Sequence, residues 1–177
     1  LLVVGGSQGA RVMSDVVPGA IECLDPALWG RLILTQQVRE EDMARVRAVY
    51  TRLKINAELA PFFSDLPARL AASHLVVSRS GAGTVAELAA IGRPSILVPL
   101  PGAIDQDQFA NAGVLAQVGG ALRIPQAEFT SRRLAAEISA LAAEPAKLTA
   151  MAVAARKMGR LDAAERLADL VMKTAGI

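Results

Sequence analysis

The sequence has little of what several classes of functional site require. It contains one cysteine, Cys23, and one histidine, His74, among 177 residues. A single cysteine excludes an internal disulfide framework and a cysteine-cluster metal site, and a single histidine excludes any constellation that needs two. We expect Cys23 to pack as a small core residue and His74 to be structural rather than catalytic.

Aromatic side chains, long apolar runs and an excess of one charge are also missing. Phe, Trp and Tyr make up 3% of the chain. No run of about 18 or more apolar residues occurs, so no membrane span is expected. Nineteen Lys and Arg stand against 17 Asp and Glu, a formal charge of +2 that does not indicate nucleic-acid binding. Hydrophobic residues reach 53%, enough to form a sizeable core and to exclude disorder.

Short apolar runs alternate with helical stretches along the chain. The expected strands are residues 1–4, 31–35, 57–60, 74–78, 95–100 and 121–124. The expected helices are residues 10–24, kinked or split at Pro18 and Gly19, then 40–54, 64–72, 85–91, 108–118 and three more from residue 130 onward. This alternation predicts an α/β fold: one Rossmann-like domain over residues 1–177, with a doubly wound, six-stranded parallel sheet and a helical C-terminal tail. Because the opening LLVVGG is typical of a strand already under way, we expect the chain to be part of a longer protein.

Two glycine-rich loops follow predicted strands and precede predicted helices. The first is residues 5–10 (GGSQGA), and the second is residues 80–84 (SGAGT). Glycine lets a backbone approach a ligand closely, and a helix N-terminus offers free N–H groups to a phosphate. Each loop alone is weak evidence, because tight turns use the same residues. In a sheet of order 3-2-1-4-5-6, however, the two loops leave neighbouring strands at the ligand-binding switch point. Together they predict a site for an anionic ligand.

Glu87 has two interpretations. Thr84 and Glu87 have the spacing of a capping box, in which each side chain satisfies a backbone N–H of the other at a helix start. Alternatively, the Glu87 carboxylate accepts hydrogen bonds from the hydroxyls of a ribose. The sequence alone leaves both open.

Common nucleotide signatures do not fit. The dinucleotide fingerprint G-x-G-x-x-G has Val4 where its first glycine belongs, and Gln36 and Gln37 stand where its acidic residue is expected. A P-loop, G-x-x-x-x-G-K-[ST], is also absent. A carboxylate on the helix after the fourth strand favours a mononucleotide bound on the second half of the sheet.

Four motifs in fixed order carry a family resemblance: residues 3–11 (VVGGSQGAR), 78–87 (SRSGAGTVAE), 92–94 (GRP) and 105–112 (DQDQFANA). The ordered set resembles the C-terminal half of the MurG family, peptidoglycan N-acetylglucosaminyltransferases with a GT-B fold. That resemblance covers essentially the whole chain. It implies an inverting enzyme that transfers GlcNAc from UDP-GlcNAc to lipid I, making lipid II.

The resemblance also implies partners, a location and a division of labour. The partners are UDP-GlcNAc, an N-terminal acceptor domain that this chain lacks, lipid I and the inner-membrane surface, with no nucleic acid. The full protein would be cytoplasmic and peripheral on the inner membrane. No catalytic group, cofactor or metal is expected in this chain. The base that deprotonates the acceptor would lie in the missing domain, so the chain alone should bind UDP-GlcNAc weakly and be inactive.

By motif match, the donor-binding residues divide among four segments. Ser7 would contact the diphosphate, Glu87 the ribose hydroxyls, and Phe63 the uracil edge through its backbone, with Leu66 packing nearby. Asp107 and Gln108 would hold the GlcNAc hydroxyls. The full set is Ser7, Gln8, Gly9, Phe63, Leu66, Ala82, Gly83, Thr84, Val85, Ala86, Glu87, Asp107 and Gln108.

The sequence departs from the family after the second strand. Many relatives carry His-Gln-Thr/Ser-Gly there, whereas this chain has residues 36–39 (QQVR), which puts a donor contact from that loop in question. Asp105 and Asp107 also form a D-x-D pattern, for which we favour no metal because helix N-termini can stabilise a leaving diphosphate. The alternatives are another GT-B UDP-sugar transferase, half of a UDP-sugar epimerase, or a non-catalytic nucleotide-binding module.

Overall fold

Six parallel strands form one sheet in the order β3-β2-β1-β4-β5-β6. The computed structural model describes residues 1–6, 9–102 and 107–176. The strands are β1 (Leu2–Val4), β2 (Leu34–Gln37), β3 (Ala57–Ala60), β4 (Val76–Ser78), β5 (Ser95–Leu97) and β6 (Ala121–Arg123). The predicted doubly wound sheet is therefore confirmed. Strands β1 to β3 extend from the centre of the sheet to one edge, and β4 to β6 extend from beside β1 to the other edge. Strand β2 lies three residues later at its start than the sequence predicts.

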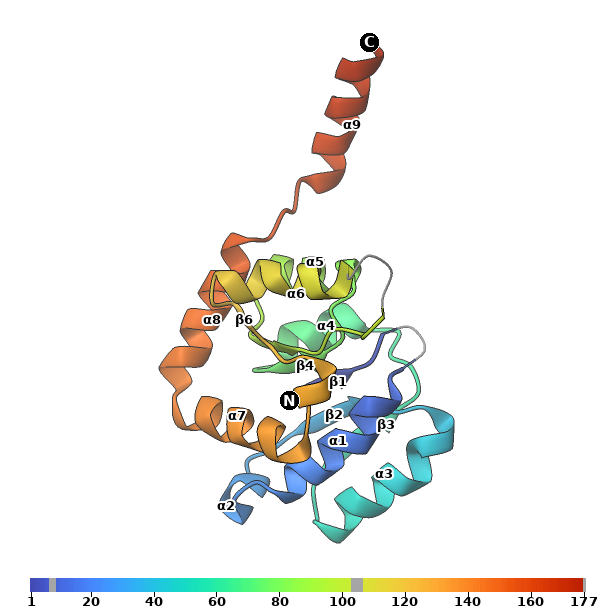
Figure 1. Cartoon of the computed structure of the whole chain (residues 1–177), viewed down its shortest axis with the longest axis vertical. Helices are drawn as coiled ribbons and strands as arrows, with labels where there is room; N and C mark the ends of the chain where they lie inside the picture. Colours follow the sequence, from blue (N-terminus) through green and yellow to red (C-terminus); the bar gives the residue numbers. More distant parts are fainter. Residues whose placement is uncertain (7–8, 103–106, 177) are drawn as a thin grey trace.

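Helices cover both faces of the sheet (Figure 1). One face carries α1 (Arg11–Glu22), α3 (Glu40–Arg52) and α7 (Ser131–Ala143), and the other carries α4 (Leu66–Ala72), α5 (Ala82–Ile91) and α6 (Asp107–Gln117). The alternation of side chains along β1 shows how the two cores divide. Val3 packs into the first core, whereas Leu2 and Val4 pack into the second.

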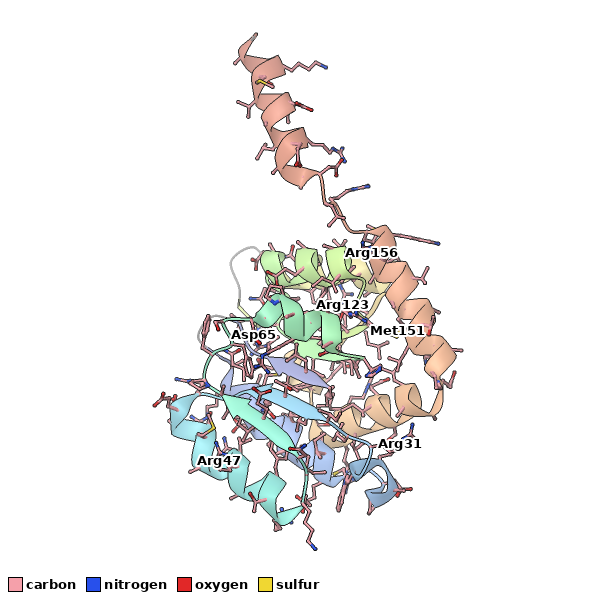
Figure 2. All side chains as sticks on the ribbon, turned by 180° about the vertical axis from the view of Figure 1, so that it is seen from behind. Arg31, Arg47, Asp65, Arg123, Met151 and Arg156 are labelled. Carbon is pink, nitrogen blue, oxygen red and sulfur yellow. The ribbon has the colours of Figure 1, made fainter. Side chains whose placement is uncertain are left out.

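The C-terminal segment is helical, as the sequence predicts, and part of it packs against the body of the domain. Helix α7 packs against α1, and α8 (Pro145–Lys157) packs against α5. Met151 and Arg156 mark α8 where it lies along the body of the domain (Figure 2). Only α9 (Ala163–Ala175) projects away from the sheet (Figure 1). Among the described residues no single helix is long and apolar enough to cross a membrane; α7 and α8 pass such a test only as a pair bent by 99°.

The sequence predicts a kink or a split at Pro18 and Gly19, and the split is wrong, because helix α1 runs as one helix through both residues. A proline inside a helix lacks the N–H that would bond the carbonyl four residues earlier, here that of Ser14. Arg45 of α3 supplies a replacement, because its Nη1 donates to the Ser14 carbonyl oxygen at 3.2 Å. A tertiary contact therefore offsets the local cost of the proline.

Two smaller differences lie at the end of α1. Cys23 is exposed at the C-cap, so the prediction of a core cysteine is wrong. The short helix α2 (Pro26–Trp29) follows, which the sequence reading missed. Its signal was present: Pro26 occupies the first turn, and Asp25 accepts a hydrogen bond from the Ala27 N–H at 2.8 Å.

Replacing Asp42 with Asn should make the protein less stable at neutral pH but not in acid. The Arg45 guanidinium donates to Asp42 at 2.8 Å and to Asp15 at 2.7 Å, and the first of these bonds lowers the pKa of the Asp42 carboxyl. A lowered folded-state pKa stabilises the fold above the unfolded-state value near 4, and this stability is lost as pH falls through the folded pKa. We expect Asp42→Asn to lower the free energy of unfolding by about 1 kcal/mol at pH 7, and by less and less as the pH falls through the folded-state pKa. Urea titrations at pH 7 and at successively lower pH measure this, and an equal loss at every pH would contradict the charge argument.

Candidate nucleotide-binding site

The two glycine loops meet at the C-terminal edge of the sheet. Strands β1 and β4 are paired, with Val4 opposite Ser78, so the loops that leave them are neighbours. Between these loops lies a cavity of about 820 Å³. Its lining comes from both loops, from α1 and from α6, and includes Gly5, Gly6, Gly9, Gly81, Gly83, Thr84 and Gln108. The structure thus brings together the residues that the topology argument predicts.

The first loop turns tightly at its glycines. Gly6 and Gly9 have φ values of +94° and +70°, and the Gly9 N–H donates to the Gly6 carbonyl at 3.0 Å. Both φ values lie in the region that side chains disfavour. Gly9, one of the predicted ligand-binding residues, lines the cavity. Ser7 and Gln8, the other two predicted ligands of this loop, fall outside the described residues.

The second loop delivers the start of α5 to the cavity. The helix begins at Ala82, so the N–H groups of Ala82, Gly83 and Thr84 occupy its first turn, where no intrahelical acceptor exists. The helix dipole adds positive potential at the same end. Val85, also in the predicted set, has its side chain buried in the core, and its N–H donates to the Gly81 carbonyl at 3.0 Å. Ala86 is exposed on the same helix.

Glu87 is not part of a capping box. A capping box requires its Ser or Thr at the N-cap, but the N-cap of α5 is Gly81 and Thr84 lies inside the helix. Glu87 is exposed and borders a second cavity of about 250 Å³. The capping-box interpretation of Glu87 is therefore wrong.

The second cavity adjoins the first along Gly6, Gly83 and Thr84, which line both. Its outer wall is the segment after β3. Phe63 is buried, with the Arg69 guanidinium 4.3 Å from its ring centroid, and Leu66 opens α4. Arg69 is held in turn by Asp65, labelled in Figure 2, at 2.7 Å.

The sequence reading missed Phe62, whose ring is 65% exposed at the rim of the second cavity. Its adjacency to Phe63 was the available signal. An exposed aromatic ring beside a partly apolar cavity is suited to contact the face of a base.

Asp107 and Gln108, the two predicted sugar-binding residues, begin α6 but lie in different surroundings. Gln108 lines the large cavity, and its Oε1 accepts a hydrogen bond from the Leu100 N–H at 3.0 Å. Asp107 is exposed and accepts from the Gln108 N–H at 2.7 Å, which ties it to the helix start. The buried Ser80 hydroxyl donates to the Gln108 carbonyl at 2.7 Å, joining the second glycine loop to α6. Asp105 lies outside the described residues.

Neighbouring contacts fix the same turn of α6. Arg123 reaches from β6 toward that turn (Figure 2), and its Nη1 donates to the Phe109 carbonyl at 3.2 Å. The Arg123 guanidinium also lies 3.7 Å from the centroid of the Phe109 ring.

Arg79 is a second residue to which the sequence assigned no role. It directly follows β4, lines the large cavity and is held by three acceptors. Nη1 donates to the carbonyls of Val98 and Pro99, each at 3.1 Å, and Nη2 donates to Gln126 Oε1 at 2.5 Å. Burial lowers the pKa of the Arg79 guanidinium, which still remains charged at neutral pH. The wall of the cavity therefore carries a fixed positive charge.

A metal-ligand cluster is not found in the part of the chain that the structure describes: no three His, Cys, Asp or Glu side chains gather there. His74 lines a different, largely apolar groove together with Leu1, Leu141 and Leu148. The donors that face the large cavity are backbone N–H groups and arginines, which suit an anion.

Gly83→Ala should separate stability from ligand binding. A Cβ at Gly83 would meet no atom within 4 Å, and the open space around it belongs to the two cavities that Gly83 lines. Alanine favours the helix over glycine by about 0.5 kcal/mol, so the melting temperature should rise slightly. UDP affinity should nevertheless fall by about tenfold or more, because a methyl group occupies the shared wall. Calorimetric titration and thermal unfolding measure the two effects, and unchanged affinity would contradict the placement of the ligand.

Comparison with known families decides the classification. Residues 1–167 match the model of the glycosyltransferase family 28 C-terminal domain. The chain belongs to this family. The family 28 domain is 84% identical over all 177 residues to a UDP-N-acetylglucosamine–N-acetylmuramyl-(pentapeptide) pyrophosphoryl-undecaprenol N-acetylglucosamine transferase of Bradyrhizobium diazoefficiens, and it covers 48% of that protein. It therefore spans about half the length of the curated relatives it matches.

Solved structures are similar to this domain as well. The family 28 domain is similar to the crystal structure of Acinetobacter baumannii MurG, with a TM-score of 0.86 and 32% identity over 97% of this chain and 51% of that one. It is also similar to a UDP-GlcNAc 2-epimerase from Neisseria meningitidis bound to UDP-GlcNAc, with a TM-score of 0.65 and 12% identity over 97% and 43% of the two chains. At that identity the epimerase likeness shows the fold alone.

Proposed function

We propose that this chain is the donor-binding half of an inverting glycosyltransferase that moves GlcNAc from UDP-GlcNAc to lipid I in peptidoglycan synthesis. The observation that carries the proposal is the start of α5, where free N–H groups and Glu87 face two adjoining cavities. The name of the Bradyrhizobium diazoefficiens relative supports the choice of substrates. The proposal places the acceptor site and the base outside these 177 residues, in the N-terminal half of the full protein.

The two cavities divide the donor between them. The uracil and ribose fit the smaller cavity, where Phe62, Phe63 and Leu66 offer apolar surface and Glu87 offers a carboxylate to the ribose hydroxyls. The diphosphate lies along the shared wall at Gly83 and Thr84. The sugar then extends into the larger cavity toward Gln108, beside Asp107.

The chemistry that this half contributes is stabilisation of the leaving group. In the proposed reaction the acceptor hydroxyl attacks the anomeric carbon, the bond to the diphosphate oxygen breaks, and UDP departs. Negative charge then accumulates on the diphosphate. The α5 N-terminus and the Arg79 guanidinium supply positive potential at that place before the reaction starts. We propose that no metal ion or other cofactor is needed in this half.

The exposed aliphatic face of α9 fits the same division into halves. Leu167, Leu170 and Val171 are each about 60% exposed, and the helix stands clear of the sheet (Figure 1). We propose that α9 packs on the N-terminal half. We further propose that the full protein works on the cytoplasmic face of the inner membrane, where its lipid-linked acceptor is held, and that nucleic acid is not a partner.

A chimera tests the proposed function. The matching segment of the Bradyrhizobium diazoefficiens relative is replaced by this chain, and transfer of labelled GlcNAc from UDP-GlcNAc to lipid I is measured. We expect activity within about tenfold of the parent enzyme, because 84% of the aligned residues are identical. A folded but inactive chimera, beside an active parent, would contradict the proposal. Binding of UDP without transfer would favour a non-catalytic nucleotide-binding module.

A further inference from the structure

Gln37 is a buried amide at the end of β2 that joins two separate segments. Its side chain is 5% exposed. Its Oε1 accepts a hydrogen bond from the Gly5 N–H at 2.9 Å, and its Nε2 donates to the Gly6 carbonyl at 2.9 Å and to the Pro61 carbonyl at 3.1 Å. Both Nε2 hydrogens and one Oε1 lone pair are therefore used.

The partners of Gln37 belong to the two walls of the candidate site. Gly5 and Gly6 begin the first glycine loop, which lines the large cavity, whereas Pro61 leads into the segment that carries Phe62 and Phe63. Strand β2 lies between β1 and β3 in the sheet, so its last residue is placed to reach both loops. Gln37 itself borders the smaller cavity.

Removing the Gln37 amide would leave the N–H of half-buried Gly5 and the carbonyls of Gly6 and Pro61, two exposed residues, without this partner. An unsatisfied half-buried N–H costs free energy, and the two carbonyls would turn to water, so both segments would lose the link that joins them.

We propose that Gln37 is a positioning residue. It holds the segment that carries Phe62 and Phe63, where the base would bind, at a fixed separation from the first glycine loop on the phosphate side of the site. This inference rests on the proposed function for the identity of the ligand. The sequence offered the departure at residues 36–39 as a reason to question a donor contact from this loop. The inference gives this segment a different role, in which Gln37 at the end of β2 acts through its bonds to the Gly5, Gly6 and Pro61 backbone.

Gln36 provides a matched control on the same strand. It is fully buried but faces the opposite side of the sheet, where its Oε1 accepts from the Tyr50 hydroxyl at 2.5 Å and its Nε2 donates to the Met13 carbonyl at 3.4 Å. Methionine has nearly the same length as glutamine but cannot make these bonds. Gln37→Met and Gln36→Met should therefore both lose stability, and only the first should disturb the site.

The experiment compares UDP binding and hydrogen exchange in the wild-type chain and the two variants. We expect Gln37→Met to raise the Kd for both UDP and uridine by about tenfold, and to speed exchange of the Gly5 amide by about tenfold in the absence of ligand. Gln36→Met should lower the melting temperature but keep both Kd values within about twofold of wild type. Gln37→Glu should behave like Gln37→Met, because a carboxylate oxygen would face the Gly6 and Pro61 carbonyls.

The outcomes separate the inference from the proposed function. If Gln37→Met binds UDP like wild type, or if both methionine variants weaken binding equally, the positioning role is overturned. If the wild-type chain binds no UDP, the proposed function fails instead. The exchange of the Gly5 amide then decides the inference by itself: faster exchange in Gln37→Met alone supports the positioning role, and equal exchange in all three proteins overturns it.

Discussion

Glu87→Ala should weaken UDP binding by about 100-fold while leaving the fold intact. A carboxylate that accepts hydrogen bonds from ribose hydroxyls contributes about 2–3 kcal/mol, which corresponds to that loss. Stability should change little, because Glu87 is exposed and does not belong to a capping box. Calorimetric titration with UDP and thermal unfolding of the same samples measure both effects.

A deoxy ligand sharpens this test. The wild-type chain should bind 2′-deoxy-UDP more weakly than UDP by about tenfold, and Glu87→Ala should bind the two alike, because the hydroxyl partner is gone. Glu40→Ala is the matched control, since Glu40 is an exposed glutamate in the first turn of α3, outside both cavities. If Glu87→Ala loses stability but keeps its UDP affinity, the assignment of this carboxylate to the ribose is wrong.

Gly5→Ala should damage both the fold and the site. A Cβ at this position would lie 2.1 Å from the Ala10 nitrogen and 2.7 Å from the Gly9 carbonyl carbon. Backbone atoms cannot move aside as a flexible side chain can, so the loop must rearrange. We expect the free energy of unfolding to fall by about 3 kcal/mol or more, and UDP binding to be lost.

Gly30→Ala is the control for Gly5→Ala. Gly30 has no atom within 4 Å of an added Cβ, and its φ is −65°, which any residue adopts. This variant should unfold within about 0.5 kcal/mol of wild type in urea titrations and bind UDP normally. Wild-type stability in Gly5→Ala would show that the first loop is not packed as tightly as the structure has it.

The sheet could be predicted from sequence because its information is local. Apolar runs and glycine loops occur in the order that a doubly wound sheet requires, and the right-handed crossover rule leaves few alternatives. The boundary of β2 was misplaced because the apolar pattern there is misleading. Ile33, which looks like a strand residue, is 75% exposed, whereas Gln36 and Gln37 are buried in the strand.

Those two glutamines show what a single sequence does not contain. A buried amide is tolerated only where partners satisfy it, and the partners here come from the first glycine loop, α1, α3 and the segment after β3. None of them can be found from the neighbours of Gln36 and Gln37 in the chain. The proline in α1 is similar, since the arginine that compensates for it lies on α3.

The candidate site was predictable where it depends on motifs and less so where it depends on tertiary contacts. Gly9, Thr84, Glu87 and Gln108 all border the predicted crevice. Arg79 lies inside the motif at residues 78–87, but its fixed position depends on three hydrogen-bond acceptors that are distant in the sequence. The false capping box arose because the T-x-x-E spacing here begins within the first turn of a helix that starts at Ala82, and not at the N-cap.

Calorimetric titration of the 177-residue chain with UDP, and in parallel with NADH, tests the central claim most directly. The two cavities, the α5 N-terminus and Glu87 predict that UDP binds with one-to-one stoichiometry and that NADH does not compete with it. Binding of NADH without binding of UDP would contradict the assignment of this crevice to a uridine diphosphate sugar.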